Sequence, residues 1–585
     1  MRCIITLLVV GLLVPSPAAL LAQDSAAAIA ELRARMAALE RENSNLKAAV
    51  MNRPSSSETL GASAYYTGVV VDPAGDAGEN QVRSIVEQYL SERGVEQASL
   101  ETTTSQPTAG SAAQGTVVGA DLNMTAKWTA NGAELATKDG AFKARLAGRV
   151  QAYAAFIQSP DPTTITSIPA GAGTKDSFYF RRLRLGGYGT MWEQIDWATE
   201  FDIANTEFNV DPAAGGNNPP TGLRSNAAFP AGGNVISIVA PTDVWMTFRE
   251  LPFGNIRIGN QKELIGMEHI QSSRFLDFME RSPLQDAFNG PNNNGFTPGM
   301  TVYNTTESQN ATWGVGMFKN NDYQSGFPFE VGNNNYVYNA RVTWTPYYDE
   351  STDGRTLLHV GLGSVVRILD NEPAGYTGGT NIRIRARPNI RNVASTLTPN
   401  VVDTGNFYAS NQFLLDPEVA FVYGPLTIQA EYEHCQLAGA RATRTAGPAL
   451  GTVNFQGGYV AVLYFLTGEN KIYNRQQGAF GRVVPFENAY LARGVGLGGT
   501  GAWQVAFRYD WIDLNSGLVK GGNVHNLTFG LNWFLNPQTK FIFNYVPSYI
   551  DNTAPVANVN NSLNGSRYVG TGVLNSFGTG LVWDF

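Results

Sequence analysis

Apolar and polar side chains alternate with a period of two along most of the chain, from about residue 121 to the C-terminus. In the segment WQVAFRYDW (503–511) every odd position is apolar or aromatic, whereas Gln504, Arg508 and Asp510 occupy even positions. The same alternation recurs in residues 142–156, 195–203, 527–533 and 577–585. A period of two is that of a β-strand with one apolar and one polar face, so the pattern predicts an all-β structure.

Alternation alone would also suit a soluble β-sandwich with one hydrated face. Two features favour a lipid-facing wall instead. Aromatic residues (30 Phe, 24 Tyr and 10 Trp) are concentrated on the apolar faces, and the last residue, Phe585, is itself aromatic. Only 15% of the residues are charged, against about a quarter in soluble proteins. Beyond the N-terminus no run of eighteen apolar residues occurs, which excludes a helical membrane protein and indicates a transmembrane β-barrel.

The connections between the predicted strands are of two kinds. Residues 535–540 form a tight turn, whereas residues 204–241 and 546–570 are long and rich in Asn, Gly and Pro. Alternating short and long connections are typical of periplasmic turns and extracellular loops. At roughly 28 residues per strand with its loop, the chain supplies about 16 strands. We therefore expect residues 121–585 to form an all-β transmembrane antiparallel barrel, which is a pore unless its lumen is plugged.

The N-terminus has the features of an export signal. Arg2 precedes an apolar stretch that ends at Val14, and Pro15 and Pro17 follow it. Small residues then lead to a predicted cleavage site after Ala22. Residues 1–22 are accordingly predicted to be a signal peptide, and the chain is expected to be exported across a Gram-negative inner membrane.

Residues 23–51 carry a heptad pattern that predicts a short α-helical coiled coil. The predicted interface is Ile29, Leu32, Met36, Leu39, Asn43, Leu46 and Val50. Arg35 and Glu40, and likewise Glu42 and Lys47, would be oppositely charged across a parallel self-association. The heptads do not decide between two and three strands, and an amphipathic helix packed on its own chain is the alternative. Residues 52–120 are predicted to be a flexible periplasmic linker with one amphipathic helix at 79–95.

Composition excludes several classes of function. The chain has 41 basic and 49 acidic residues, a net charge of −8, which argues against nucleic-acid binding. Its two cysteines and four histidines show no metal-ligand spacing, so no metal or cofactor is expected. No GxSxG nucleophile motif occurs, so no enzyme is expected. A structural role remains as an alternative, with the N-terminal coiled coil tethering the outer membrane to the cell wall.

Several blocks, in order along 121–585, resemble the phosphate-selective porin O and P family. They include FYFRRLRLGGYGTMWEQIDWATEFDIA, IRIGNQKELIGMEHIQSSRFLDFMERS, FLTGENKIYNRQQGAFGRVVPF and GAWQVAFRYDWIDLN. The resemblance implies an outer-membrane barrel of 16 strands, a homotrimer, an inward-folded loop that narrows the lumen, and basic residues that guide small anions such as phosphate. It also implies that the coiled coil is trimeric.

The basic residues that match the family's pore are Arg145, Arg149, Arg182, Arg184 and Lys262. The alternation itself places Arg182 and Arg184 in the lumen, because Leu183 and Leu185 point outward. It places Arg181 outward, unless Arg181 lies at the end of the strand. The segment IRIRARP adds Arg383, Arg385 and Arg387 on one face. Such an arginine ladder suits phosphate. Alternatively, the arginines only pair with lumen acids such as Glu200, Asp202, Glu431, Glu433 and Asp510, and the pore is non-selective or prefers cations.

Residues 263–288 break the alternation and are too mixed to form a strand. We expect them to be the constricting loop, with Arg274 and Arg281 as its candidate charges. The alternative is an ordinary extracellular loop with surface charges. The expected partners are thus outer-membrane lipid, further copies of the chain, small anions and, through the coiled coil, cell-wall components.

Overall fold

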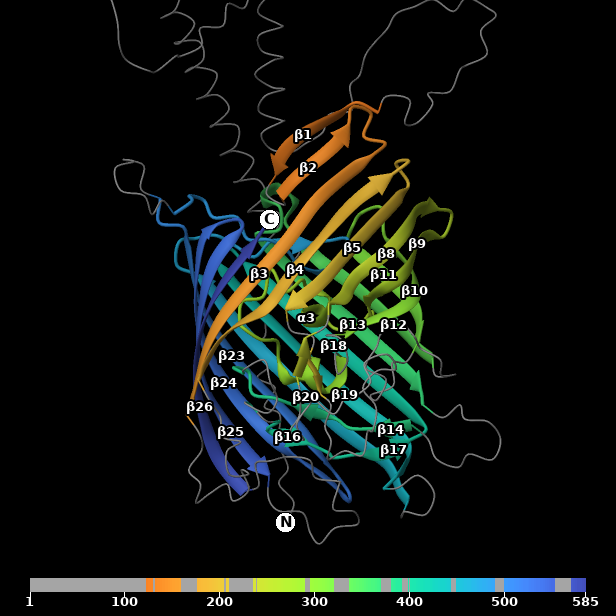
Figure 1. Cartoon of the computed structure of the whole chain (residues 1–585), viewed down its shortest axis with the longest axis vertical. Coiled ribbons are helices and arrows are strands. Elements are labelled where there is room, and N and C mark those ends of the chain that lie inside the picture. Colours follow the sequence, from red (N-terminus) through yellow and green to blue (C-terminus); the bar gives the residue numbers. More distant parts are fainter. Residues whose placement is uncertain are drawn as a thin grey trace, which may run out of the picture. The chain divides into compact units, whose positions relative to one another are not determined.

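Sixteen antiparallel strands close into a barrel in the computed structural model, as the sequence predicts (Figure 1). The structure describes residues 122–129, 132–158, 176–204, 207–209, 235–237, 239–289, 295–319, 336–369, 380–391, 398, 400–442, 449–489, 499–552 and 570–585. The barrel strands are β3 (Lys143–Gln158), β4 (Ser177–Met191), β5 (Ile195–Ala204), β8 (Ala240–Leu251), β9 (Gly254–Lys262), β10 (Phe296–Thr305), β11 (Ala311–Lys319), β12 (Tyr336–Tyr348), β13 (Thr356–Ile368), β18 (Asn411–Tyr423), β19 (Leu426–Arg441), β20 (Ala449–Phe465), β23 (Ala502–Ser516), β24 (Val519–Asn536), β25 (Thr539–Asn552) and β26 (Gly570–Asp584).

The predicted signal peptide, the coiled coil and the linker with its helix all lie outside the described residues. No helix in the described part of the chain is long and apolar enough to cross a membrane.

The barrel closes where the last strand, β26, pairs with β3. Phe585 and Gly148 exchange two backbone hydrogen bonds of 2.9 and 3.1 Å, so the C-terminal residue is part of the wall. β26 pairs with β3 only as far as Arg149. The first residues of β3 pair on the same edge with β2 (Gly132–Thr137), and β1 (Met124–Thr129) pairs with β2. The first described hairpin therefore extends the wall at this end of the barrel.

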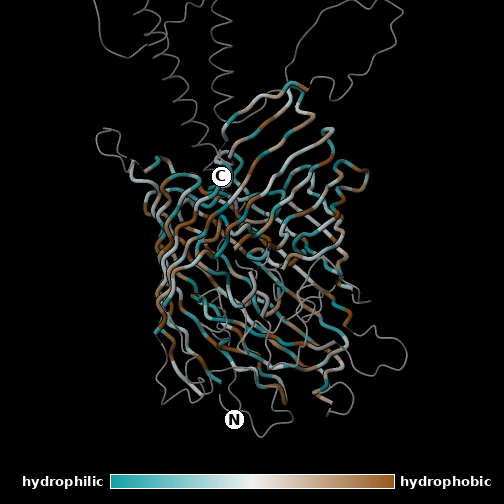
Figure 2. Tube along the Cα trace, in the orientation of Figure 1, coloured by the Kyte–Doolittle hydropathy of each residue, from teal (hydrophilic) through white to brown (hydrophobic). Residues whose placement is uncertain are grey.

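The two faces of the wall differ as the alternation predicts. On β23, Val505 and Phe507 are exposed on the outside, whereas Gln504, Arg508 and Asp510 are fully buried inside the barrel. Figure 2 shows the resulting change of hydropathy from residue to residue along the strands. An apolar outer face and a polar inner face are typical of a transmembrane β-barrel.

The two ends of the barrel have different connections. At one end, here called the short-turn end, most hairpins are tight, such as the turns after Leu251, Tyr423 and Asn536. The opposite end, the long-loop end, carries the long connections, including β6 (Glu207–Asn209) and β7 (Val235–Ser237). Two connections break this rule. The turn between β23 and β24 is tight although it lies at the long-loop end. The link between β20 and β23 is long although it lies at the short-turn end.

The connection between β9 and β10 folds into the lumen and is called the inward loop (residues 263–295, described to 289 and at 295). It contains the short helices α3 (Met267–Ile270) and η2 (Gln285–Asn289), and Figure 1 shows α3 inside the ring of strands. Lumen-facing Asn532 and Lys540 of β24 and β25 donate to its carbonyls, at 2.8 and 2.6 Å. The loop therefore crosses the barrel from β9 to the opposite wall, as expected for a constricting loop.

Two further segments enter the lumen. The connection between β13 and β18 (369–410), called the second lumen loop, contains β14 (Thr380–Ile382), β15 (Arg385–Ala386), β16 (Val402–Asp403) and β17 (Phe407–Ala409). Residues 466–489, called the turn-end segment, follow β20 and contain β21 (Tyr473–Asn474) and β22 (Ala479–Phe480).

The turn of η4 (Glu350–Thr352) lies between β12 and β13.

Part of the lumen is a hydrophobic core rather than a water-filled space. The inward loop contributes Ile265, Phe278 and Phe288, and the second lumen loop contributes Ile384 and Phe407, all at 6% exposure or less. Inward apolar side chains of the wall pack on them, namely Val337, Val365, Leu414, Leu437, Val453, Phe455, Ile512, Leu514, Val546 and Leu574. Burial of this apolar surface fixes the two loops in the barrel.

Candidate functional site: a basic vestibule in the barrel

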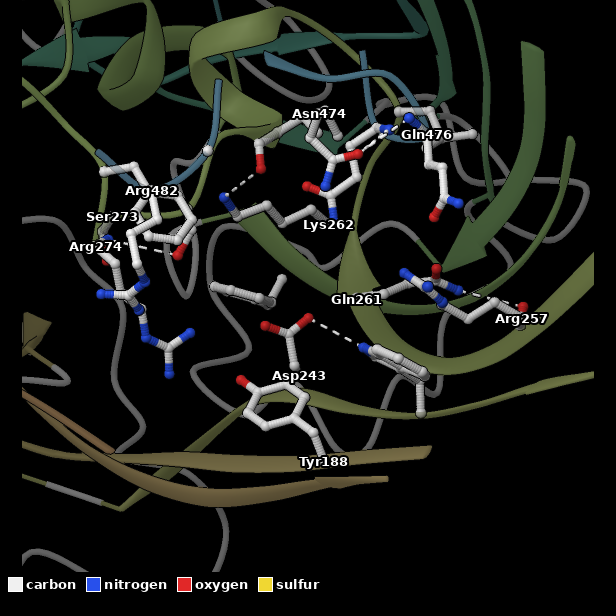
Figure 3. Close-up of a pocket in the computed structure, with 18 of the residues that line it drawn as sticks. Tyr188, Asp243, Arg257, Gln261, Lys262, Ser273, Arg274, Asn474, Gln476 and Arg482 are labelled. Atoms are coloured by element: carbon white, nitrogen blue, oxygen red, sulfur yellow. Dashed lines mark hydrogen bonds between the residues drawn. The ribbon is translucent and has the colours of Figure 1, made fainter. Parts of the chain in front are cut away.

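The lumen contains a cavity of about 790 Å³, here called the basic vestibule. Side chains of β3, β4, β8 to β12, the inward loop and the turn-end segment line it. Figure 3 shows Tyr188, Asp243, Lys262 and Arg274 around the same space, with Arg257 to one side. Its walls therefore come from segments that are far apart in the sequence.

The lining of the basic vestibule is strongly positive. Among the described residues that line it, ten are basic and only two, Asp243 and Asp584, are acidic. The basic residues are Arg145, Arg149, Arg182, Arg184, Arg257, Lys262, Arg274, Arg281, Arg341 and Arg482. A chain with a net charge of −8 thus has a local concentration of positive charge inside its barrel, which attracts anions.

The structure brings together seven of the ten basic residues singled out in the sequence. Arg145, Arg149, Arg182, Arg184 and Lys262 of the wall, and Arg274 and Arg281 of the inward loop, all line the vestibule.

The other three, Arg383, Arg385 and Arg387, do not line this cavity. They alternate with buried Ile382, Ile384 and Ala386 as expected, but they belong to the second lumen loop and not to a strand of the wall. Arg383 forms an ion pair with Asp403 of the same loop at 2.7 Å.

The expectation that Arg181 points outward is wrong. The pairing of β3 with β4 shifts by one residue at this point, from Gln151 opposite Arg182 to Ala152 opposite Phe180, which leaves Arg181 as an extra residue. Such a β-bulge lets two successive side chains point to the same face. Arg181 is consequently buried inside the barrel, where its guanidinium binds the carboxylate of Glu280 on the inward loop.

Glu280 is held by arginines from two sides. Arg391 of the second lumen loop donates to it at 3.1 Å, and also binds Asp286 of the inward loop. Burial alone would raise the pKa of Glu280, but Arg181 and Arg391 outweigh this effect and hold its pKa well below the usual range. This cluster of ion pairs connects the wall and both lumen loops.

A second carboxylate neutralises several of the vestibule's arginines. Glu200 of β5 is fully buried and lies 2.7 Å from Arg149, 3.2 Å from Arg184 and 3.1 Å from Arg274. Three guanidinium groups therefore share one carboxylate, although Arg184 also pairs with Asp202 at 2.8 Å. Arg274 also lies 3.5 Å from Asp584, so these three arginines face three carboxylates in all.

Five of the vestibule's cations form no ion pair with a carboxylate in the described part of the chain. They are Arg145, Arg182, Arg257, Lys262 and Arg281. Their contacts are with neutral groups: Arg182 donates to the amide oxygen of Gln151 at 2.7 Å, and Arg257 to the hydroxyl of Thr247 at 2.9 Å. Lys262 and Arg281 donate to backbone carbonyls of the inward loop. None of these hydrogen bonds supplies a counter-charge.

Glu418 of β18 pairs with the vestibule's Arg341 at 2.6 Å, whereas Glu431 and Glu433 of β19 do not line the basic vestibule. Glu431 accepts the backbone N–H of Glu268 at 2.7 Å, and Glu433 accepts the side-chain amide of Asn289 at 3.0 Å. Both contacts are with the inward loop. These carboxylates therefore hold the loop against the wall opposite the vestibule, rather than neutralising the vestibule's arginines.

Sequence reasoning missed Arg257, Arg341 and Arg482. A signal existed for the first two, because Arg257 lies between the outward-facing Ile256 and Ile258, and Arg341 lies in a similar alternating segment. Arg482 had no such signal. It lies on the turn-end segment, and only the fold brings it to Asp584, at 3.1 Å.

A closed sixteen-stranded wall with an apolar outer face, lumen loops and a vestibule inside defines the class of this protein: it is an outer-membrane porin, a channel and not an enzyme. A model of the family described as phosphate-selective porin O and P matches residues 168–567. The chain belongs to this family.

Two relatives illustrate the similarity. Porin O of Pseudomonas aeruginosa is 25% identical over 478 residues, which cover 78% of this chain and 92% of that protein. A protein of Caulobacter vibrioides described as uncharacterized is 25% identical over 417 residues, covering 70% of this chain and 68% of its own.

Among solved structures, an anion-selective porin from Comamonas acidovorans has a TM-score of 0.40 at 12% identity, covering 76% of this chain and 100% of its own. The trimer form of the Vibrio cholerae outer-membrane protein OmpT has a TM-score of 0.41 at 10% identity with the same coverages.

Proposed function

We propose that this porin conducts small anions, phosphate among them, and that the basic vestibule is the part of the pathway that selects them. The observation that carries the proposal is the set of five vestibule cations that form no ion pair with a carboxylate among the described residues. Arg145, Arg182 and Arg257 belong to this set. In a polar lumen, such groups attract anions and repel cations before any contact is made.

Guanidinium groups suit phosphate chemically. Each presents several N–H donors in a plane, so it can replace part of the hydration shell of a phosphate with charge-assisted hydrogen bonds. Such bonds hold the anion only briefly when several similar sites follow one another, which permits passage as well as selection. The description of the family as phosphate-selective agrees with this choice of solute.

A non-selective or cation-preferring pore is the competing function. It would require the lumen acids to dominate the pathway. Instead, Glu431 and Glu433 bind the inward loop, and Glu200 is shared by three arginines. These contacts favour anion preference.

The proposal extends to the assembly and to the N-terminal residues. We expect a homotrimer with the short-turn end in the periplasm, because short turns are typical of that side. Residues 1–22 would be the cleaved signal peptide, and residues 23–51 a trimeric coiled coil in the periplasm. Deletion of residues 23–120 tests the alternative tethering role: a tether loses envelope integrity, whereas the single-channel conductance of the barrel survives.

The experiment that tests anion selection is the reversal potential of the purified protein in a planar bilayer under a KCl gradient, repeated with added phosphate. We expect a reversal potential of the sign that anion preference gives, and block of the chloride current by phosphate. A double variant, Arg145→Gln with Arg257→Gln, should move the reversal potential towards zero and weaken the block.

Arg249→Gln is the matched control. Arg249 lies at the end of β8, pairs with Asp196 at 3.3 Å and is 37% exposed, and it does not line the vestibule. This variant should keep the wild-type reversal potential. A cation-selective wild-type channel, or a double variant with unchanged selectivity, would contradict the proposal.

A further inference from the structure

The basic vestibule contains aromatic rings as well as cations, although binding of small hydrated anions does not require aromatic rings. Tyr188 of β4, Trp245 of β8 and Tyr303 of β10 line the cavity, and each has the strand parity of a lumen-facing residue. Porin lumens are generally polar. Passage of inorganic anions therefore does not explain why three half-buried aromatic rings lie on the inner wall.

Trp245 and Tyr303 are arranged around Arg257. The guanidinium carbon of Arg257 lies 3.8 Å from the centroid of the Trp245 ring and 5.2 Å from that of Tyr303. Arg257 also donates to the hydroxyl of Tyr303 at 3.0 Å. These contacts place the guanidinium over the Trp245 ring and beside the hydroxyl of Tyr303, across three neighbouring strands.

The third ring has the same kind of neighbour. The guanidinium carbon of Arg145 lies 5.4 Å from the centroid of Tyr188, and that of Arg274 lies 5.9 Å from it. Arg145 and Arg257 are among the cations without a carboxylate partner. The vestibule therefore places unpaired cations directly beside aromatic faces, the combination with which proteins bind ring-bearing anions such as single-stranded nucleic acids.

The size of the cavity also exceeds what an inorganic anion needs. A volume of about 790 Å³ falls within the roughly 300–1,000 Å³ of pockets that hold small organic molecules. Polar neutral groups such as Gln261 and Asn474 complete the wall. An anion with an organic group attached fits these dimensions.

We propose that the vestibule selects organic phosphates that carry a planar ring, with the phosphate on the unpaired arginines and the ring against Trp245 and Tyr303. The inference rests on the proposed anion pathway and specifies its solute. The ring contributes affinity through stacking on the aromatic side chains and on the plane of Arg257. A phosphate without a ring uses only the arginines.

Phenyl phosphate and methyl phosphate test this inference as a matched pair, because they carry the same head group and differ in the ring. We expect phenyl phosphate to block the chloride current at a concentration about tenfold lower than methyl phosphate, the scale of a single stacking interaction. Trp245→Leu should abolish this difference, and Trp245→Phe should retain most of it. Trp503→Leu, which removes an outward-facing ring of β23 far from the vestibule lining, should leave the difference unchanged.

Equal block by the two phosphates in the wild-type channel would overturn the inference, as would a preference for phenyl phosphate that survives Trp245→Leu. Equal weakening of both phosphates in Trp245→Leu would also overturn it, since the ring would then only position Arg257. Calorimetric titration of the detergent-purified protein with both compounds measures binding without conduction. Equal affinities for phenyl and methyl phosphate would show that the ring site is absent. Tighter binding of phenyl phosphate without any anion current would show instead that the proposed anion channel is wrong.

Discussion

Lys471 and Asp277 join two segments that enter the barrel from opposite ends. The ammonium group of Lys471, on the turn-end segment, lies 2.7 Å from a carboxylate oxygen of Asp277 on the inward loop. Lys471 is fully buried, and Asp277 also accepts from the amide of Gln504 in the wall at 3.1 Å. The two segments are thus joined to each other and to the wall inside the barrel.

Removal of this contact should widen the pore. Loss of one partner of a buried ion pair costs about 3–5 kcal/mol, because the other charge stays buried without its partner. We expect Lys471→Met to raise the single-channel conductance and to lower the thermal stability of the barrel. Bilayer recordings and thermal unfolding in detergent provide the measurements.

The control for this variant is Lys127→Met. Lys127 pairs with Glu134 at 3.1 Å on the β1–β2 hairpin, but its side chain is 62% exposed, so the pair contributes little. Conductance and stability should remain as in the wild type. If Lys471→Met also leaves the conductance unchanged, the turn-end segment does not help to narrow the pore.

Glu280 provides a prediction about pH. Its pKa is held well below the usual 4.5, so its contribution to stability is fully present above about pH 4.5 and is lost as the pH falls towards the lowered value. Glu280→Gln should therefore reduce the free energy of unfolding by about 3–5 kcal/mol at neutral pH. This difference should stay constant from pH 8 to 5 and shrink only in stronger acid.

Urea unfolding of the wild type and the variant across this pH range is the measurement. A difference that stays constant into strong acid as well would mean that the folded-state pKa of Glu280 is close to its ordinary value and is not lowered by Arg181 and Arg391. The exposed Glu350, whose carboxylate is 68% exposed beside Arg475, gives a control variant, Glu350→Gln, with little effect at any pH.

The sequence predicted those parts of the fold that depend on local pattern. Strict alternation determines which face of a strand is apolar, so the lumen positions of Arg182 and Arg184 could be inferred from a single segment. The number of strands followed from the chain length and the usual number of residues per strand and loop. Arg181 could not be placed from its segment, because a bulge shifts the parity and no local signal in RRLRL indicates where the shift occurs.

The segments inside the barrel depend on packing between distant parts of the chain. Residues 263–288 could be recognised as a loop because they break the alternation, whereas the turn-end segment was not expected to enter the lumen at all. Its contacts, such as that of Lys471 with Asp277, link positions almost two hundred residues apart. The same reason explains why Arg383 was expected along the pore, although its partner Asp403 lies within its own loop.

Gly295 gives a steric test of the inward loop, since it lies where the loop returns to β10. Its φ of 80° is left-handed, and a Cβ at this position would lie 2.6 Å from the backbone oxygen of Asn289 and would also overlap the ring of His269. We expect Gly295→Ala to displace the loop, which increases the conductance and lowers the thermal stability.

Gly424 is the matched control, because its φ of 55° is also left-handed but a Cβ there would meet nothing within 4 Å. Both substitutions cost about 1–2 kcal/mol for the backbone conformation, and only Gly295→Ala adds the overlap. Equal losses of stability and equal conductance in the two variants would show that the packing around Gly295 tolerates a side chain.

Substitutions of Arg274 and of Glu200 should shift the preference for anions over cations in opposite directions. Glu200 is bound by Arg149 and Arg184 as well as by Arg274, so loss of Arg274 leaves the carboxylate paired. Arg274→Gln should therefore lower the anion preference, measured as a reversal potential closer to zero. It should destabilise the barrel less than Glu200→Gln does, because Asp584 also keeps a partner, Arg482. Glu200→Gln should raise the anion preference, because three guanidinium groups lose their shared counter-charge, and should destabilise the barrel by several kcal/mol. Shifts of the same sign in the two variants would mean that the vestibule's net charge does not determine which ions pass.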